Sequence, residues 1–161
     1  RAHGTLQEQA VELELANEEL QGVGQALAAQ RDALEALTTA REAEHRRLET
    51  LLAQLPVGVV VAEHPSGRIV RGNDRLAAIL RHPVLRSQSV AEYEAWVGWH
   101  PDGRPVQPDE WPLARALAGA TVPPSDVLYR KGDGAEEWVR IAARPVRDAD
   151  GALTAAVAVV E

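Results

Sequence analysis

The chain has 161 residues, contains no cysteine and carries a formal net charge of −7, from 17 Lys and Arg against 24 Asp and Glu. The lack of cysteine excludes disulfides, zinc–thiolate sites and thiol nucleophiles, and it fits a reducing compartment, so we expect a cytoplasmic location. An acidic chain lacks the basic excess that phosphate binding needs, so no nucleic acid partner is expected.

The prolines divide the chain into two parts. All ten of them lie at or after Pro56. We therefore predict two domains: residues 1–55 as a coiled-coil helix for signalling and dimerisation, and residues 56–161 as a domain large enough to bury its own core. No apolar run reaches the ~18 residues of a membrane span, so none is expected in this fragment.

Leucine recurs every seventh residue in the first part, and only Arg41 interrupts the series. This leucine stripe consists of Leu6, Leu13, Leu20, Leu27, Leu34, Leu48 and Leu55. Thr5 and Glu8 have capping-box spacing, which predicts a helix start there. A seven-residue apolar repeat predicts a parallel coiled coil, hence a homodimer. The predicted dimer contacts are Leu13, Leu20, Val23, Leu27, Leu34, Leu37, Leu48 and Leu51.

The predicted coiled coil has weak points that leave alternatives open. Gly22 and Gly24 each cost about 1 kcal/mol of helix propensity relative to alanine, and Arg41 and Glu44 place charges in core positions. These features fit an ordinary weak coiled coil, a linker that changes register with a signal, or a helical hairpin folded at the glycines. A second register would pair the leucines with positions that include Asn17 instead of Ala16.

The second part alternates strand and helix signals in a defined order. Residues 57–72 predict two strands around a turn, and Asn73 predicts the N-cap of a helix over residues 74–80. Loops and short helices are expected up to about residue 107, followed by a helix around residues 113–118. Three strands joined by hairpins complete the chain. This order predicts an α+β fold, with an antiparallel sheet and helices on one face.

The second part resembles a PAS domain of the kind found in bacterial sensor histidine kinases. The resemblance rests on "GVVVAE…SGRIVRGN" with Asn73, on "RKGDG…EWVRIAARPVRDADG", and on the final "AVAVV". It covers nearly all of residues 55–161. It implies a five-stranded antiparallel sheet in the order 2-1-5-4-3, a pocket between sheet and helices, and signalling through flanking helices.

Departures from that family limit the cofactors that can be expected. Light-sensing relatives that form a flavin photoadduct and relatives with a thiol-linked chromophore both need a cysteine, so both chemistries are excluded. Val139 and Val160 replace amides that hold the flavin ring. Haem is not expected either, because the helix at residues 113–118 has no histidine, and His82 and His100 read as surface or turn residues. The cofactor stays unknown.

Strand alternation assigns the candidate pocket lining. Residues 139, 141 and 143 point to one face of their strand, and residues 138, 140, 142 and 144 to the other. The candidate lining is Val60, Ala62, Trp111, Val139, Ile141, Ala143 and Val160. Such an apolar set suits a small apolar ligand, and it equally suits a filled core.

No catalytic or metal-binding motif is found in this sequence. We therefore expect a dimeric sensory module that relays a cue to an output domain outside this fragment, with a histidine kinase of a two-component system as the expected parent protein. The alternative is a ligand-free dimerisation or protein-docking PAS module in another regulatory protein, such as a cyclase or a transcription regulator.

Overall fold

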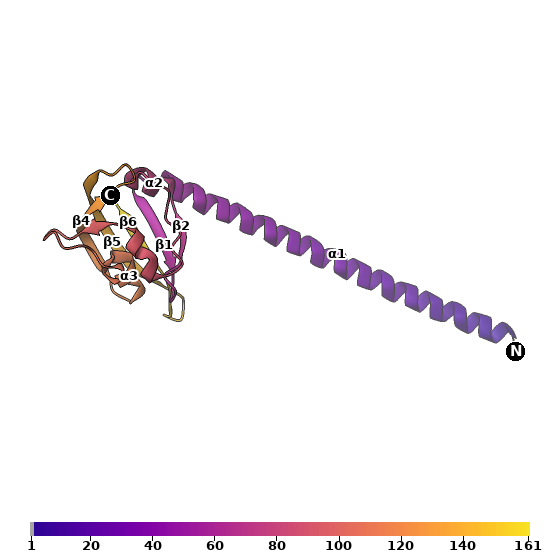
Figure 1. Ribbon diagram of the computed structural model, residues 1–161. Helices are drawn as coiled ribbons and strands as arrows, with labels where there is room; N and C mark the ends of the chain where they lie inside the picture. Colours follow the sequence, from indigo (N-terminus) through magenta and orange to yellow (C-terminus); the bar gives the residue numbers. More distant parts are fainter. Residues whose placement is uncertain (1) are drawn as a thin grey trace. The chain divides into compact units, whose positions relative to one another are not determined.

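The computed structural model describes residues 2–161, with side chains from Thr5 onward (Figure 1). The chain divides into two compact units. The first ends at Glu49 and is helical, and the second spans Thr50–Glu161. In the described part of the chain, no helix combines the length and apolar character that a membrane span needs.

Helix α1 spans Ala2–Gln54 without a break. It passes through Gly22 and Gly24 with helical geometry, so the alternative of a hairpin at these glycines is wrong. The helix also begins before Thr5, which corrects the predicted start. A capping-box spacing inside a longer run of helix formers marks a helix start only if the preceding residues leave the helix, and they do not. The predicted stop before Pro56 is confirmed.

The leucine stripe is exposed along α1. Leu13 and Leu20 are 73% and 70% exposed, and the other predicted contact residues of this helix are 49–66% exposed. Leucines at seven-residue spacing lose favourable burial energy when they stay in water, at roughly 25 cal/mol per Å² of apolar surface. The helix is therefore consistent with a coiled coil, in which a second helix covers the stripe.

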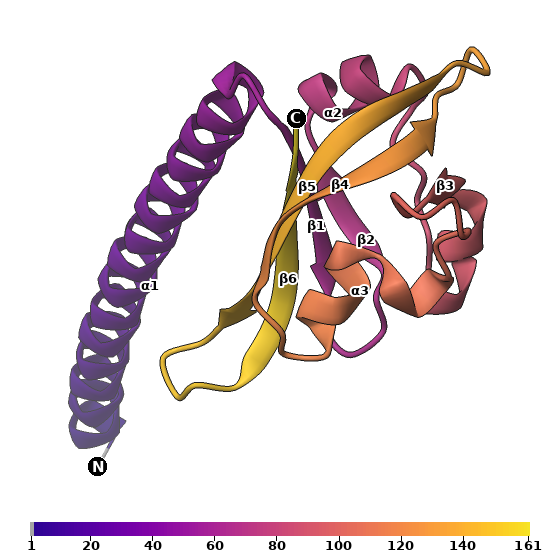
Figure 2. The same ribbon diagram turned by 90° about the vertical axis from the view of Figure 1, so that its left-hand side faces the viewer.

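The second unit is built on one antiparallel sheet of six strands (Figure 2). The strands in chain order are β1 (Gly58–Glu63), β2 (Ile69–Gly72), β3 (Gly98–Trp99), β4 (Val122–Arg130), β5 (Glu136–Arg147) and β6 (Leu153–Val160). Their order across the sheet is β2-β1-β6-β5-β4-β3. The five longer strands thus follow the expected order 2-1-5-4-3.

Two details of the sheet differ from the prediction. The two-residue strand β3 adds a sixth member at the β4 edge, with Gly98 opposite Tyr129. Strand β4 starts at Val122, earlier than expected, and includes Pro123 and Pro124. Proline cannot donate to a strand ladder, and the pairing with β5 shifts register between Val122 and Ser125.

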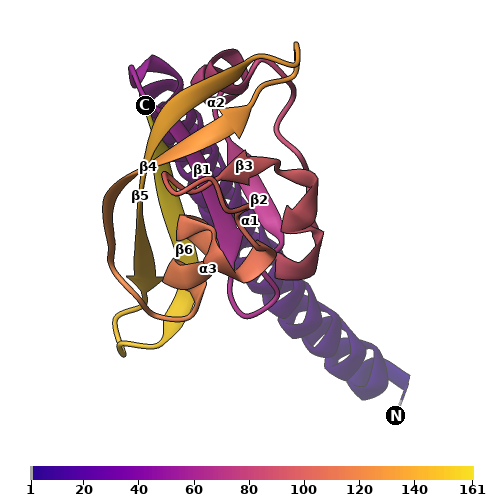
Figure 3. The ribbon, with the colours of Figure 1, turned by 60° about the vertical axis from the view of Figure 1, so that its left-hand side comes forward.

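The helices between β2 and β4 lie on one face of the sheet, as expected (Figures 2 and 3). They are α2 (Asp74–Leu80), the 3₁₀ helices η1 (Val90–Ala95) and η2 (Pro108–Glu110), and α3 (Pro112–Leu117). Helix α3 contacts β5 and β6, and α2 contacts β1. The helix predicted around residues 113–118 is therefore present over Pro112–Leu117, and Gly119 lies just after its end at a φ of 93°.

Candidate functional site

The seven residues predicted to line a pocket are all buried in the PAS-like unit. Val60 and Ala62 lie in β1, Val160 in β6, and Trp111 directly before α3. Residues 139, 141 and 143 lie in β5. None of the seven is more than 6% exposed, and all belong to one hydrophobic core cluster. The structure brings these residues together, and their role as a ligand pocket stays a prediction.

The two faces of β5 differ as the alternation predicts. Val139 is 2% exposed, whereas its neighbour Trp138 is 56% exposed. Arg140 is also exposed and pairs with Asp126 on the adjacent strand at 2.8 Å. This pair raises the pKa of the Arg140 guanidinium and lowers that of the Asp126 carboxyl. The face with the helices is therefore apolar, and β5 carries charge on the opposite face.

Aromatic rings form a connected cluster inside the core that the sequence alone did not predict. Trp96 and Trp111 meet edge to face with centroids 5.9 Å apart, and Trp111 meets Tyr129 in the same way at 6.1 Å. Tyr93 stacks on Trp96 at 5.8 Å. Gly98 makes the close packing feasible, because a Cβ there would lie 2.8 Å from the Trp111 ring. The loops beside the sheet are thus held by ring contacts.

Some polar atoms of this aromatic cluster have hydrogen-bond partners and others do not. Tyr93 donates its hydroxyl hydrogen to the Gly67 carbonyl at 2.7 Å. Among the residues that the structure describes, no acceptor pairs with the buried indole nitrogens of Trp96 and Trp111. Buried donors are normally paired, so these two N–H groups are the polar positions of the core at which an acceptor would be favoured.

Tyr129 connects the cluster to the surface through His82. The His82 Nδ1 lies 2.7 Å from the Pro83 carbonyl, which can only accept, so Nδ1 carries a proton. In the neutral ring, Nε2 therefore accepts from the Tyr129 hydroxyl at 2.7 Å. Burial raises the pKa of Tyr129 to about 12 and that of Tyr93 as well. Both phenols are neutral donors at physiological pH.

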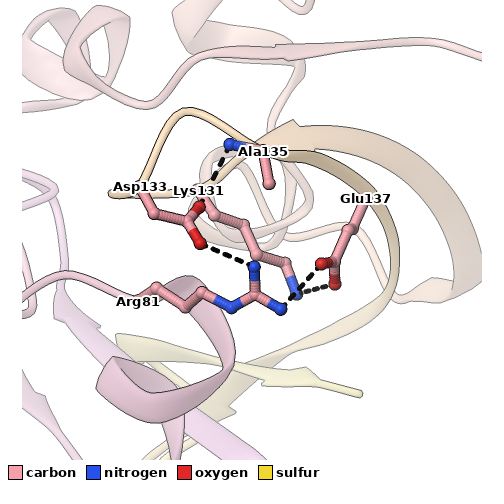
Figure 4. A network of polar contacts seen from close by, with 5 residues as sticks. All are labelled: Arg81, Lys131, Asp133, Ala135 and Glu137. Atoms are coloured by element: carbon pink, nitrogen blue, oxygen red, sulfur yellow. Dashed lines mark hydrogen bonds and ion pairs between the residues drawn. The ribbon is translucent and has the colours of Figure 1, made fainter.

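The C-terminal end of α2 is fixed by ion pairs (Figure 4). Arg81 ends this helix in the left-handed region, at a φ of 58°, where glycine is the usual residue. Its guanidinium donates to Asp133 and to Glu137, at 2.7 Å each, and Lys131 also pairs with Glu137. The pKa of Asp133 is lowered, first by the Ala135 backbone N–H, and that of Glu137 is lowered first by Lys131. Four charged side chains thus connect α2 to the β4–β5 turn.

A second polar cluster organises the loop before α3. Glu110 accepts from the backbone N–H of Gln107 at 2.9 Å, and it pairs with His100 at 3.1 Å and Arg104 at 2.8 Å. The Gln107 backbone hydrogen bond, followed by the His100 and Arg104 contacts, lowers the pKa of Glu110 to about 2. Both histidines that were considered for haem thus have polar partners. In the described residues, no group of three or more His, Asp or Glu is arranged to hold a metal ion.

Asn73 occupies the beginning of α2, as predicted, and accepts from the Leu76 N–H at 3.0 Å. Its side chain also hydrogen-bonds to the backbone of Leu52, Val57 and Val59. These contacts lie within the second unit, which includes the last turn of α1. The N-cap was recognisable from the local pattern, but the other three partners were not, because they lie 14 to 21 residues earlier in the chain.

The comparisons with solved structures identify the fold. The PAS domain of an HTR-like protein from Haloarcula marismortui matches with a TM-score of 0.57 and 18% identity, over 79% of this chain and 98% of that one. The PAS domain of the fruit-fly ELK potassium channel matches with a TM-score of 0.53 and 12% identity, over 72% and 94% of the chains. An RNA-binding light-oxygen-voltage receptor matches with a TM-score of 0.54 and 17% identity, over 71% of this chain and 31% of that one.

These likenesses concern structure alone. No family model matches the chain, and no curated protein matches its sequence. The α+β unit nevertheless has the PAS fold, preceded by a long helix whose exposed leucines are consistent with a coiled coil.

Proposed function

We propose that this chain is a sensory module in which two PAS domains are paired through a parallel coiled coil formed by α1. The observation that carries the proposal is the short connection between the two parts: α1 ends at Gln54, and the first strand of the PAS fold begins at Gly58. A helix that pairs along its leucine stripe therefore leads directly into the sheet. A change in the domain can act on the helix without a flexible linker between them.

A cue in or around the core is the proposed input. The seven predicted lining residues offer an apolar environment, and the indole N–H groups of Trp96 and Trp111 offer donors. This combination suits a small, largely apolar ligand that carries a hydrogen-bond acceptor. A flavin photoadduct is not proposed, because the chain lacks cysteine. The proposed output is a domain outside this sequence, with a histidine kinase as the first candidate.

Native mass spectrometry of the chain purified from cells tests the sensory role. A retained ligand gives a native mass above that of the polypeptide, and the excess disappears under denaturing conditions. The expected result is this excess, with the same ligand mass in independent preparations. A native mass equal to a whole number of polypeptides, with no excess, would contradict a tightly bound ligand.

A second candidate function is a ligand-free dimerisation or docking module. The burial of the seven lining residues favours it, because side chains that fill a core at near-crystal density leave no room for a ligand. The parent protein in that case is another regulatory protein, such as a cyclase or a transcription regulator. The mass experiment above separates the two candidates.

A further inference from the structure

The side chain of Asn73 uses its whole hydrogen-bonding capacity. Its Oδ1 accepts from the N–H groups of Val59 at 2.9 Å and Leu76 at 3.0 Å. Its Nδ2 donates to the carbonyls of Leu52 and Val57, both at 3.0 Å. A primary amide has two N–H hydrogens and one oxygen with two lone pairs. All four bonding positions are therefore occupied by backbone groups.

The chemistry of the partners fixes which way the amide points. Both groups near Oδ1 are N–H donors, and both groups near Nδ2 are carbonyl acceptors. If the amide were reversed, its NH₂ would face two donors and its oxygen would face two carbonyls. The orientation of the Asn73 side chain is thus defined by its surroundings.

The oxygen and the nitrogen of the Asn73 amide form hydrogen bonds with different secondary-structure elements. The acceptor half bonds the first turn of α2 and the start of β1, through Leu76 and Val59. The donor half bonds the Leu52 carbonyl in the last turn of α1, which also accepts from the Leu55 N–H at 3.4 Å, and the carbonyl of the connecting residue Val57. One side chain therefore caps the beginning of α2 and the end of α1 together.

Neighbouring residues hold the same region together. Gly58, the first residue of β1, lies close to α2. A Cβ at this position would be 3.0 Å from the Leu76 Cα, so only glycine allows the approach without a shift of the backbone. Arg75, in the first turn of α2, donates from Nε to the Pro56 carbonyl at 3.1 Å. Pro56 and Val57, between α1 and β1, are thus bonded to the start of α2, and Asn73 is the side chain that extends this connection to α1.

We infer that Asn73 is a positioning residue that couples the last turn of α1 to α2 and the sheet through the donor half of its amide. A displacement of α2 then changes the hydrogen bonding at the end of α1. The use of this coupling to transmit a signal rests on the proposed sensory function. The coupling itself does not, because all its partners lie in the chain at hand.

The substitution Asn73→Asp tests the coupling selectively. Aspartate has nearly the same shape and still accepts from the N–H groups of Val59 and Leu76, so the cap of α2 is kept. Its second oxygen cannot donate at neutral pH. In amide hydrogen exchange of the whole chain at pH 7, we expect residues 53–55 to exchange about 3-fold to 10-fold faster, as follows from the loss of one or two hydrogen bonds. The Leu76 amide should keep its protection within about twofold.

Two further variants make the result decisive. Gln54→Glu adds the same negative charge to the exposed last residue of α1 and removes none of the four bonds, so it controls for charge at the helix end. Asn73→Ser keeps a hydroxyl acceptor for the cap but is too short to reach Leu52, and it adds no charge. The Asn73→Ser variant therefore tests the coupling if the Asn73→Asp variant does not fold.

The outcomes are distinct. Faster exchange at the end of α1 in Asn73→Asp and Asn73→Ser, with protection kept in β5 and β6, but not in Gln54→Glu, supports the coupling. Unchanged exchange at residues 53–55 overturns it, as does an equal loss of protection throughout β5 and β6, which would make Asn73 a general stability residue. Because this experiment needs neither ligand nor output domain, its failure is separate from failure of the sensory proposal.

Discussion

Tyr93 shows how one residue can fix a loop to the sheet of this domain. It is 1% exposed, and its hydroxyl reaches the carbonyl of Gly67, 26 residues earlier in the chain. Gly67 adopts a φ of 79°, and a Cβ there would lie 2.5 Å from a Val90 methyl group. The turn therefore requires glycine, and Tyr93 holds that turn in place.

Removal of the Tyr93 hydroxyl is expected to destabilise the PAS domain. Tyr93→Phe keeps the ring and leaves the Gly67 carbonyl without this donor, at a cost of about 1–3 kcal/mol in the free energy of unfolding. Urea denaturation followed by tryptophan fluorescence measures the change. Trp138→Phe, at an exposed position, serves as the control and should stay within about 0.5 kcal/mol of the parent chain. Equal effects of the two substitutions would contradict the role of the hydroxyl.

Glu110 gives the domain a defined pH dependence. Its pKa is lowered in the folded chain from the ordinary value of 4.5 to about 2. Between these two values, the unfolded state binds more protons than the folded state, so the free energy of unfolding falls as the pH falls. This contribution is fully present above about pH 4.5 and is lost as the pH approaches 2.

The substitution Glu110→Gln should remove this share of the pH dependence. The variant is expected to be less stable than the parent at pH 7, with a smaller difference between the two at pH 2.5. Thermal unfolding by circular dichroism across this range provides the measurement. A stability difference that stays constant from pH 7 to pH 2.5 would show that the carboxylate of Glu110 does not contribute in the way described.

At the scale of elements, we expect the leucine stripe of α1 to determine association. The stripe is exposed in the single chain, and a coiled-coil partner would bury it. Leu34→Arg places a charge in the middle of this surface on both helices. We expect the dissociation constant of the dimer to rise on the order of 1000-fold, because two buried leucines are lost and charge is buried in their place. Sedimentation equilibrium over a range of concentrations measures it.

Leu15 offers a matched control on the same helix. It is a leucine 57% exposed in the single chain, and it lies outside both registers considered for the coiled coil. Leu15→Arg should therefore associate like the parent chain. If both arginine variants dissociate equally, the association does not depend on the heptad stripe.

Most elements of the domain could be predicted because their signals are local. The alternation in residues 138–144 predicts the faces of β5, and the Asn73 pattern predicts the start of α2. Strand β3 could not be predicted, since its two residues qualify as a strand only through pairing with β4. The true start of α1 was missed because Thr5 and Glu8 have capping-box spacing within a run of residues that stay helical.

The candidate site was predictable only in part, because some of its contacts follow from local sequence patterns and others depend on how distant segments fold together. Inward-facing positions such as Val139 follow from strand periodicity, and their burial agrees with that reading. The meeting of Trp96 with Trp111 depends on how the loops fold back on the sheet, which sequence spacing does not determine. The hydrogen bond that Asn73 Nδ2 donates to the Leu52 carbonyl likewise depends on where the end of α1 lies relative to α2 within the second unit.

At the scale of the whole molecule, we propose that the first unit serves dimerisation and the second unit serves sensing. The helix before Thr50 carries most of the exposed leucines, and the unit from Thr50 to Glu161 carries the core, the polar clusters and the Asn73 hydrogen bonds. Parallel pairing would place both PAS domains at the same end of the coiled coil, where a cue in either domain can act on one shared helix pair. Antiparallel pairing would separate the two domains and remove that advantage.

Disulfide cross-linking tests parallel pairing most directly, because the chain has no cysteine of its own. Single-cysteine variants Leu20→Cys and Leu48→Cys would be oxidised separately, with Leu15→Cys as the control. In a parallel, in-register dimer, every stripe position faces its own copy, so both stripe variants should form covalent dimers in high yield and the control should not. An antiparallel pair brings at most one position opposite itself. Cross-linking at only one of the two positions, or at neither, would contradict the parallel dimer.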